Sequence, residues 1–290
     1  MISHASDSSE RPTAQGVSPP RFRLPRPRLT LGEQLSAPVH DFPIRDEILY
    51  QYAPEISGLR ILEIGPGSGF TAYGLAPLVA EMKLIDLSEA TIQDLRQKVA
   101  QRGSVTFLQA DIAIPGLSAR IPERYDLIFG LDVFEYVQDA EACLHNLWTI
   151  LDSRGVLFLS FPNQPVEKKN GVLRFHTTGE LLAMLARAGF SRSEVLSVAM
   201  RPFAQRMYIA FHEWPLCAYR WLRRTAAGQP QTYEATWAFQ HRSNFAFGKL
   251  LLNCYWLFLG ALLHCAGDVL QTKPLGNEAL GHQLVVSAFK

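Results

Sequence analysis

Residues 62–69 of this 290-residue chain read Leu-Glu-Ile-Gly-Pro-Gly-Ser-Gly, and the predicted architecture follows from them. An apolar run that carries one acid, Glu63, leads into glycines at three alternating positions, Gly65, Gly67 and Gly69. This pattern is typical of a buried strand that turns sharply into a helix. Glycine leaves the backbone bare where a ligand must approach closely. The segment therefore predicts a ligand-binding turn at the carboxyl end of a strand.

The spacing of the glycines indicates which ligand the turn binds. A P-loop needs a lysine and a serine or threonine after its last glycine, but here Phe70 and Thr71 follow. The nicotinamide fingerprint is G-x-G-x-x-G, whereas this turn reads G-x-G-x-G. The carboxylate of Glu63 would repel a pyrophosphate but suits an ammonium group, and a helix N-terminus favours a carboxylate. S-adenosylmethionine, with an amino-acid end and a nucleoside end, meets both demands.

Acidic residues at the ends of further predicted strands agree with this ligand. Asp86 ends the predicted strand 82–86, 21 positions after Gly65, where doubly wound folds hold the ribose hydroxyls with an acid. Asp111 follows the predicted strand 104–108, and its carboxylate can accept a hydrogen bond from an adenine amino group while Ile112 packs on the ring. A fourth strand, 125–129, opens into a loop at 130–137. We expect these strand ends to meet at one edge of a sheet.

With these motifs the chain resembles the class I S-adenosylmethionine-dependent methyltransferases of the small-molecule branch. The resemblance covers roughly residues 43–190, includes the Ser-Phe-Pro-Asn run at 160–163, and resumes at the last strand. It implies that S-adenosylmethionine is held by a set of residues at the strand ends. These residues are Glu63, Gly65, Pro66, Gly67, Ser68, Gly69, Asp86, Leu87, Asp111, Ile112, Leu131 and Asp132.

The chain departs from this family where the methyl acceptor would be handled. Many relatives carry a Glu-His pair where this chain has Glu135 and Tyr136, so a histidine base is absent from that place. The architecture nevertheless implies that Asp132, Glu135 and Tyr136 face the methyl group. We expect His176, from the loop after the fifth strand, to be the base, with His40 as a weaker candidate.

The alternation of strands and helices predicts an α/β fold, a doubly wound Rossmann-like sheet of seven strands. Its last strand, near 283–289, is antiparallel in the family that the chain resembles. A mainly helical insert then lies between strands six and seven. The predicted organisation is a disordered leader at 1–38, a cofactor-binding core at 39–199, an insert at 200–281 that is a lid or a membrane-surface element, and the closing strand of the core at 282–290.

The insert contains a strongly apolar helix at 250–266, which just reaches the lower limit of length for a membrane span. A span is disfavoured because the closing strand must rejoin the sheet on the same side. A narrow polar stripe that includes Asn253 and His264 also argues against a span. Three interpretations remain: a lid, a membrane-surface helix that admits a lipid-linked substrate, and a homodimer interface through residues 244–268.

The composition of the chain bears on its partners, on metal binding and on its location in the cell. A net charge of +1 provides no general attraction to nucleic acid. The four cysteines form no C-x-x-C pair and no cluster with histidine, so we expect no metal site and a cytoplasmic location, with membrane association open. No apolar segment follows the first methionine, so no secretory signal is predicted.

The predicted function is S-adenosylmethionine-dependent methyl transfer, directed to an oxygen atom of a small, lipid-linked or glycan metabolite. Methyl transfer is an in-line displacement, so the protein must chiefly hold the acceptor in line with the methyl group. The alternative is a non-catalytic binding or scaffold subunit with the same fold, which the Tyr136 departure permits. A nicotinamide oxidoreductase is third, because the glycine order disfavours it.

Overall fold

The computed structural model describes residues 21–38, 45–162, 178–215, 217–218, 246–275 and 283–290. In this part of the chain eight strands form one sheet in the order β3-β2-β1-β4-β5-β8-β6-β7. The strands are β1 Arg60–Ile64, β2 Glu81–Asp86, β3 Val105–Gln109, β4 Tyr125–Leu131, β5 Leu151–Pro162, β6 Arg192–Met200, β7 Leu270–Lys273 and β8 Gln283–Phe289. Strands β1 to β5 pair in parallel, which confirms the doubly wound prediction.

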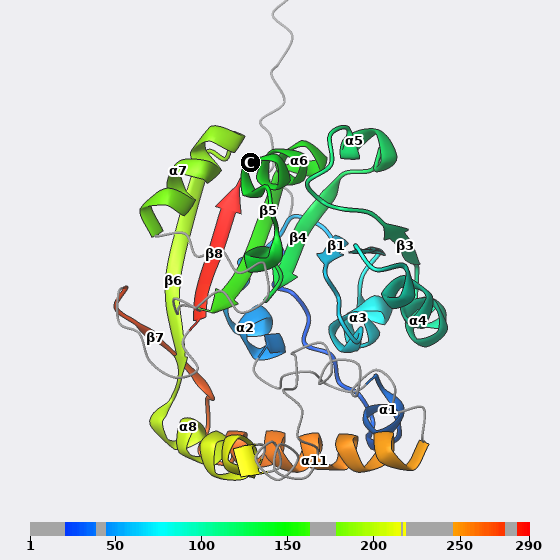
Figure 1. Cartoon of the computed structure of the whole chain (residues 1–290), viewed down its shortest axis with the longest axis vertical. Coiled ribbons are helices and arrows are strands. Elements are labelled where there is room, and N and C mark those ends of the chain that lie inside the picture. The colour runs from blue at the N-terminus through cyan, green and yellow to red at the C-terminus, as the bar shows by residue number, and fades with distance from the viewer. Residues whose placement is uncertain (1–20, 39–44, 163–177, 216, 219–245, 276–282) are drawn as a thin grey trace, which may run out of the picture.

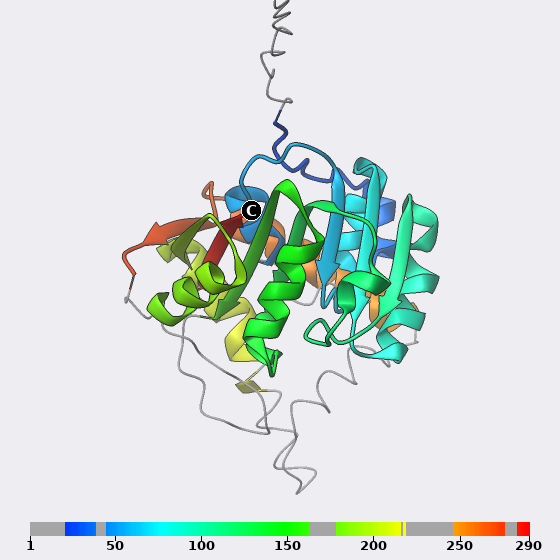
Figure 2. The same cartoon turned by 90° about the horizontal axis from the view of Figure 1, so that it is seen from above.

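Helices cover both faces of this sheet (Figures 1 and 2). The longer helices are α2 Arg45–Tyr52, α4 Glu89–Val99, α6 Ala140–Ile150, α7 Thr178–Ala188, α8 Pro202–Tyr208 and α11 Ala246–His264. The shorter ones are α1 Leu31–Ser36, α3 Phe70–Leu75, α5 Leu117–Arg120, the 3-10 turns η1 Ala76–Leu78, η2 Ala100–Arg102 and η3 Phe134–Tyr136, and the π-helical turn η4 Ile209–Glu213.

The core lies in two layers because successive strand residues point to opposite faces. In β1, Ile61 joins the apolar cluster of α2, α3, α4, α8 and α11, whereas Leu62 joins the cluster of α5, α6 and α7. Glu63 lies two residues after Ile61 on the strand, so its side chain points to the same face, the one covered by α2 and α3. The alternation thus decides which helices can reach the acid of the glycine turn.

The closing strand is where the sequence places it. β8 lies between β5 and β6 and is antiparallel to both, so the residues between β6 and β8 are inserted before the closing strand. The sheet has one strand more than the seven predicted. The additional strand β7 lies inside the insert and pairs antiparallel with the edge strand β6. Its four residues, Leu-Gln-Thr-Lys, are too short and too polar a run to predict a strand from alternation.

Residues 21–38 are ordered, contrary to the prediction of a disordered leader as far as residue 38. Phe22 exchanges two backbone hydrogen bonds with Ile56, and Leu24 is buried in the core. Helix α1 begins with a capping box, in which Thr30 and Glu33 bond each other's backbone amides. The composition of this segment, rich in serine, proline and arginine, predicted disorder. Its contacts come from packing against distant residues, which composition does not reveal.

The apolar segment of the insert forms α11, which crosses the lower end of the sheet in Figure 1 with α8 and α1 beside it. Trp256, Leu259 and Leu263 are buried on its inner side. The amide of Asn253 donates hydrogen bonds of 2.9 and 3.1 Å to the carbonyls of Leu35 and Ala37. Among the described residues, no helix has both the length and the apolar character needed to span a membrane.

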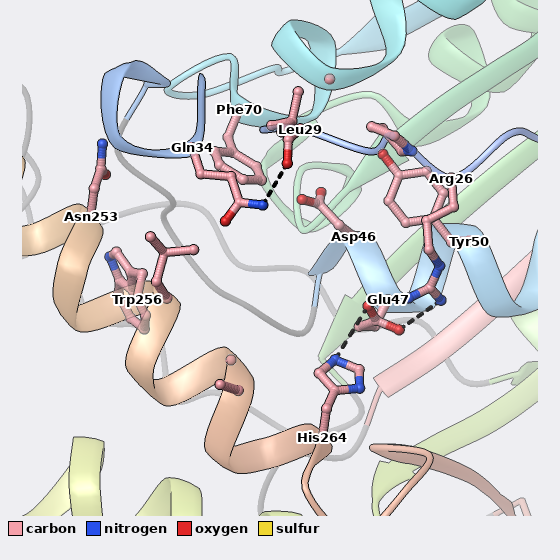
Figure 3. Close-up of a pocket in the computed structure, with 15 residues that line it drawn as sticks. Arg26, Leu29, Gln34, Asp46, Glu47, Tyr50, Phe70, Asn253, Trp256 and His264 are labelled. Atoms are coloured by element: carbon pink, nitrogen blue, oxygen red, sulfur yellow. Dashed lines mark hydrogen bonds and ion pairs between the residues drawn. The ribbon is translucent and has the colours of Figure 1, made fainter. Parts of the chain in front are cut away.

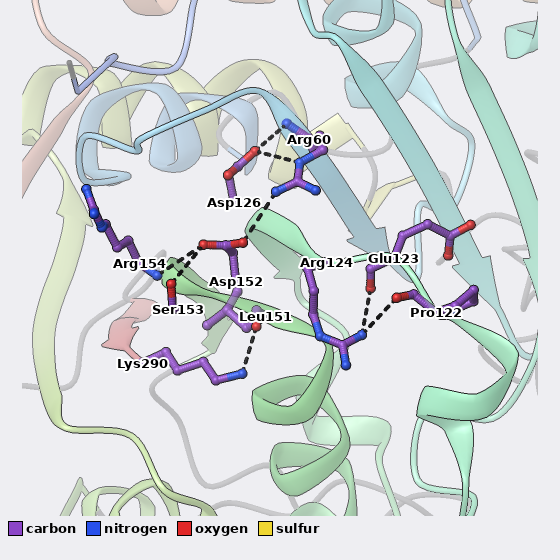
Figure 4. Close-up of polar contacts among 10 residues, drawn as sticks. All are labelled: Arg60, Pro122, Glu123, Arg124, Asp126, Leu151, Asp152, Ser153, Arg154 and Lys290. Carbon is purple, nitrogen blue, oxygen red and sulfur yellow. Dashed lines mark hydrogen bonds and ion pairs between the residues drawn. The ribbon is translucent and has the colours of Figure 1, made fainter. Parts of the chain in front are cut away.

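A polar cluster holds the opposite end of the strands together (Figure 4). Asp126 of β4 accepts hydrogen bonds from the backbone amide of Arg60 at 2.9 Å and from its guanidinium at 3.4 Å. The same guanidinium contacts Asp152 of β5 at 3.4 Å. These contacts tie together the amino ends of β1, β4 and β5, whereas the features described next gather at the carboxyl ends.

Candidate functional site

The glycine turn that follows β1 has a conformation that requires its glycines. Gly65, Gly67 and Gly69 have φ angles of +59°, +55° and +83°. A Cβ atom at Gly65 would lie 2.4 Å from Cγ2 of Val133, and one at Gly69 would lie 2.4 Å from Cδ2 of Leu95. Side chains at these positions would be strained by the backbone and would collide with neighbours. The turn therefore presents bare backbone, as predicted.

A pocket of about 350 Å³ opens beside this turn at the carboxyl ends of the strands. It brings together six of the residues predicted to be in the site: Gly65, Asp86, Leu87, Asp111, Ile112 and Tyr136. The pocket is completed by Ile64, Ile85, Ala110, Val133, Val137 and Gln138. Acids at its rim and apolar side chains on its walls suit a ligand with a polar ribose and a flat base.

The two rim acids are held by their own turns. Asp86 accepts a hydrogen bond of 2.8 Å from the backbone amide of Ser88, and Asp111 accepts one of 2.8 Å from that of Ala113. Such Asx turns fix the carboxylates at the ends of β2 and β3. Backbone geometry thereby keeps both acids at the mouth of the pocket.

Glu63 is a buried acid beside the glycine turn. Its side chain is 3% exposed, and its Oε2 atom has no hydrogen-bond partner among the described residues. Burial raises the pKa of Glu63 to about 8, although the charge of Arg45 opposes the shift. A buried carboxyl oxygen with no hydrogen-bond partner destabilises the folded protein. An ammonium group placed against the turn would supply the missing donor, so the site fits the predicted ligand.

Arg45 and Asp46 contact residues next to the glycine turn and the loop after β4, and sequence reasoning missed both. Arg45 of α2 donates a hydrogen bond of 2.5 Å to the carbonyl of Leu131, and its Nε atom lies 4.0 Å from Oδ2 of Asp132. Asp46 accepts a 2.5 Å hydrogen bond from Oγ1 of Thr71. The available signal was the charged Arg-Asp-Glu run opening a helix that was expected to cover the cleft.

The loop after β4 carries the predicted acceptor-side residues. Asp132 has a left-handed backbone with φ 53°, and its amide donates a 2.8 Å hydrogen bond to Ser160. Burial raises the pKa of Asp132, with Arg45 opposing the shift. Glu135 is 3% exposed, and burial followed by repulsion from Asp132 raises its pKa to about 8. This loop therefore concentrates acids in a poorly solvated region.

Of the remaining predicted site residues, four lie in the part of the chain that the structure describes and the two histidines do not. Pro66 and Ser68 are buried within the turn, and Leu131 is buried at the end of β4. Tyr136 is 44% exposed and lines the pocket next to the rim acids. His176 and His40 lie outside the described residues, so the base assigned to them stays a prediction.

Comparison with known proteins places this site in a family. Residues 62–157, which hold the glycine turn, both rim acids and the loop after β4, match the family model described as a methyltransferase domain. This chain carries a class I S-adenosylmethionine-dependent methyltransferase domain. The resemblance seen in the motifs is thereby confirmed for the segment that forms the pocket.

Two curated relatives of this methyltransferase domain share a name, ubiquinone biosynthesis O-methyltransferase. The protein of Leptothrix cholodnii is 27% identical over 128 residues, which cover 44% of this chain and 54% of that protein. The protein of Paraburkholderia phytofirmans is 31% identical over 133 residues, covering 45% and 56%. The chain thus spans about half the length of these curated relatives.

A solved structure shows the fold of the methyltransferase more broadly. Phosphoethanolamine N-methyltransferase 2 of Haemonchus contortus matches 88% of this chain and 53% of its own chain, with a TM-score of 0.51 and 15% identity. At this identity the likeness establishes the fold alone.

A second pocket, of about 440 Å³, lies on the other side of the methyltransferase turn, between residues 26–34, α2, the start of α3 and α11 (Figure 3). At one end Arg26 donates hydrogen bonds of 2.8 and 2.9 Å to Glu47, and Nε2 of His264 lies 3.5 Å from Glu47. The sequence did not predict this pocket. In the described part of the chain, no three metal-ligating side chains form a cluster.

Proposed function

We propose that this protein is an S-adenosylmethionine-dependent methyltransferase that acts on an oxygen atom of a small, lipid-linked acceptor. One observation carries the cofactor: the 350 Å³ pocket joins Gly65, Asp86 and Asp111, and beside the same turn the buried Oε2 atom of Glu63 has no hydrogen-bond partner among the described residues. In this proposal Glu63 accepts from the ligand ammonium, Asp86 holds the ribose hydroxyls, and Asp111 meets the adenine. The bound cofactor supplies an electrophilic methyl group for in-line displacement.

Two observations support the acceptor class. The relatives are named as O-methyltransferases, which favours oxygen over nitrogen as the methylated atom. The outer side of α11 also carries an apolar stripe of exposed residues, namely Leu250, Leu251, Cys254, Phe258, Ala261 and Cys265. Phe211 on η4 and Trp214 directly after it are also exposed, and the ring of Phe211 contacts that of Phe258. Tryptophan and large apolar side chains suit a membrane interface, where a lipid-linked acceptor would be found.

A non-catalytic binding subunit is the second candidate, and Tyr136 favours it. This tyrosine stands where many relatives carry a histidine, and it lines the nucleoside pocket rather than a separate acceptor pocket. Methyl transfer by the isolated protein would exclude this candidate.

The cofactor claim is tested by titration calorimetry with S-adenosylhomocysteine. We expect saturable binding to the wild-type protein. Asp86→Ala should weaken the binding by about 1–3 kcal/mol, since it removes a hydrogen-bonding carboxylate at the pocket rim. Asp94→Ala is the matched control, because Asp94 pairs with Lys98 on α4 and does not line the pocket. Unchanged affinity in Asp86→Ala would reject the role of that acid, and no binding by the wild type would reject the cofactor.

A further inference from the structure

We propose that Glu135 faces the sulfonium group of the bound cofactor and makes the site select S-adenosylmethionine over its demethylated product, S-adenosylhomocysteine. This inference rests on the proposed methyltransferase function and names a specificity-determining residue of its cofactor site. The two ligands differ by one methyl group and one positive charge. A residue that discriminates strongly between them must therefore respond to that charge.

Two buried carboxyl groups near the glycine turn each keep one oxygen without a partner. Glu63 and Glu135 are both 3% exposed, and the Oε2 atom of each has no hydrogen-bond partner among the described residues. Asp132, a third acid of this region, lies 4.0 Å from Nε of Arg45. A buried carboxylate is destabilising unless a cation neutralises it. S-adenosylmethionine carries two cationic groups, an ammonium and a sulfonium, and so matches the two acids in number.

The loop after β4 borders the place where the cofactor sulfur belongs. In the proposed binding mode the ammonium meets Glu63, and the nucleoside fills the 350 Å³ pocket. The sulfur joins these two parts of the cofactor, so it belongs beside the glycine turn between them. Val133 packs against the turn at this point, because a Cβ atom on Gly65 would lie 2.4 Å from its Cγ2 atom. The residues around Val133 are therefore the part of the loop nearest to the sulfonium.

Within this loop the side chain of Glu135 is on the side away from the nucleoside. The charges of Asp132 and Arg45 act on its carboxyl group, and the charge of Arg45 acts on Glu63 as well. Both acids are thus within electrostatic reach of one guanidinium. Glu135 does not line the nucleoside pocket, although four residues around it do: Val133, Tyr136, Val137 and Gln138.

A carboxylate that meets a sulfonium needs no hydrogen-bond donor. A sulfonium has no N–H or O–H group, so the attraction is electrostatic, and it is stronger in a poorly solvated site than in water. The backbone amide of Glu135 bonds its own carboxyl group, which fixes the side chain while Oε2 stays open. Strand β5, which packs against η3, ends in Ser160, Phe161 and Pro162, which carry no charge.

The preference for the charged ligand should depend on pH. Burial, followed by repulsion from Asp132, raises the pKa of Glu135 to about 8, so below this pH the empty site holds a largely neutral carboxyl group. A sulfonium must then expel a proton, which weakens S-adenosylmethionine binding by up to about tenfold per pH unit below 8. S-adenosylhomocysteine lacks this charge. Glu63 meets the ammonium of both ligands, so its own ionisation cancels in the ratio of the two affinities.

This selectivity would serve turnover. After methyl transfer the ligand sulfur is neutral, and Glu135 no longer faces a cation. The product is then held less tightly than fresh cofactor, so the site exchanges one for the other.

Titration calorimetry with the two ligands tests the assignment. In the wild type we expect the affinity ratio, S-adenosylmethionine over S-adenosylhomocysteine, to rise at least about tenfold between pH 6 and pH 8. Glu135→Gln keeps the size of the side chain but removes the charge. At pH 8 this variant should lower the ratio at least about tenfold, and its ratio should change less than about threefold over the same pH range. Retained S-adenosylhomocysteine binding would show that the variant is folded.

Two further variants complete the test. Glu141→Gln is the matched control, because Glu141 lies on the surface of α6, where it pairs with Arg187, and this variant should keep the wild-type ratio at each pH. Glu63→Gln should weaken the binding of both ligands alike, because both carry the ammonium, and should therefore also keep the ratio.

An unchanged ratio in Glu135→Gln, or a wild-type ratio that does not rise with pH, would overturn the assignment of Glu135. Failure of the wild type to bind either ligand would instead overturn the proposed function, so the two failures are distinguishable.

Discussion

The protonation state of Glu63, the acid beside the glycine turn, links the stability of the fold to pH. Burial raises its pKa to about 8, so at pH 7 the carboxyl group is largely protonated in the folded protein. Its ordinary pKa is about 4.3. Between these two values the unfolded chain ionises Glu63 while the folded protein resists ionisation. This acid therefore lowers the stability of the fold as the pH rises from about 4.3 to 8, and its contribution levels off above that.

The same pKa predicts that cofactor binding releases a proton. An ammonium group beside Glu63 favours the carboxylate, so binding at pH 7 should expel the proton that Glu63 carries. Calorimetry with S-adenosylhomocysteine in buffers of different ionisation enthalpy measures this release. We expect it to approach one proton at pH 7 and to diminish by pH 9.

Two variants separate Glu63 from its neighbours in that experiment. Glu63→Gln should abolish the release, whereas Glu135→Gln should retain it, although burial raises the pKa of Glu135 to about 8 as well. The free energy of unfolding of Glu63→Gln should also fall less than that of the wild type between pH 5 and pH 8. Equal proton release by wild type and Glu63→Gln would show that the carboxyl does not meet the ammonium.

At the scale of elements, α11 joins the leader to the rest of the molecule. Asn253 is 4% exposed and donates to two carbonyl groups at the C-terminal end of α1, those of Leu35 and of the capping residue Ala37. Without this amide the carbonyls of Leu35 and Ala37 would each lose a buried donor. The apparent polar stripe of the insert helix is therefore partly a structural contact that holds the leader in place.

We predict that Asn253→Ala destabilises the protein by about 1–3 kcal/mol, because buried acceptors are left without donors. Hydrogen exchange should show faster exchange in residues 21–38, with β1 and β4 little affected. The neighbouring Cys254→Ala is the control, since Cys254 is exposed and should leave both readouts unchanged. Unaltered exchange of the leader in Asn253→Ala would contradict this attachment.

At the scale of the whole molecule, the exposed apolar stripe of α11 lies near two exposed aromatic residues, Phe211 of η4 and Trp214 directly after it. Phe258 is 54% exposed, Leu251 is 53% exposed and Trp214 is 69% exposed, so several large apolar side chains face solvent here. The charge of Arg206, exposed on α8, lies on the helix that flanks α11. An apolar surface flanked by a cation suits an anionic lipid surface.

We therefore predict that the protein floats with vesicles containing phosphatidylglycerol in a density gradient. The double substitution Leu251→Glu and Phe258→Glu should abolish flotation, because it places negative charges on exposed positions without opening the core. Exposed Leu182→Glu on α7 is the control and should float as the wild type does. A wild-type protein that stays out of the vesicle fraction and sediments as a dimer would assign the stripe to a second copy of the chain.

The sequence predicted features that depend on neighbouring residues, and it missed features that depend on contacts between residues distant in the chain. The glycine turn, Asp86 and Asp111 were predictable because each follows a buried strand, and parallel strands bring their carboxyl ends to one edge. Arg45 and Asp46 were not predictable as site residues, because α2 reaches the turn only through packing on the sheet. Strand β7 escaped prediction for a similar reason, since its pairing with β6 carries little sequence signal.

By itself the sequence determined the doubly wound core and the cofactor turn with its rim acids, because local periodicity and glycine spacing encode them. The position of the closing strand came from the resemblance to a family. Only the tertiary structure decided that residues 21–38 are ordered, that Arg45 neighbours the acids of the site, and that the insert helix forms one wall of a second pocket. These features depend on side chains brought together over long separations, such as Asn253 with Leu35 and His264 with Glu47. Such contacts form only once the sheet has placed both partners on the same face.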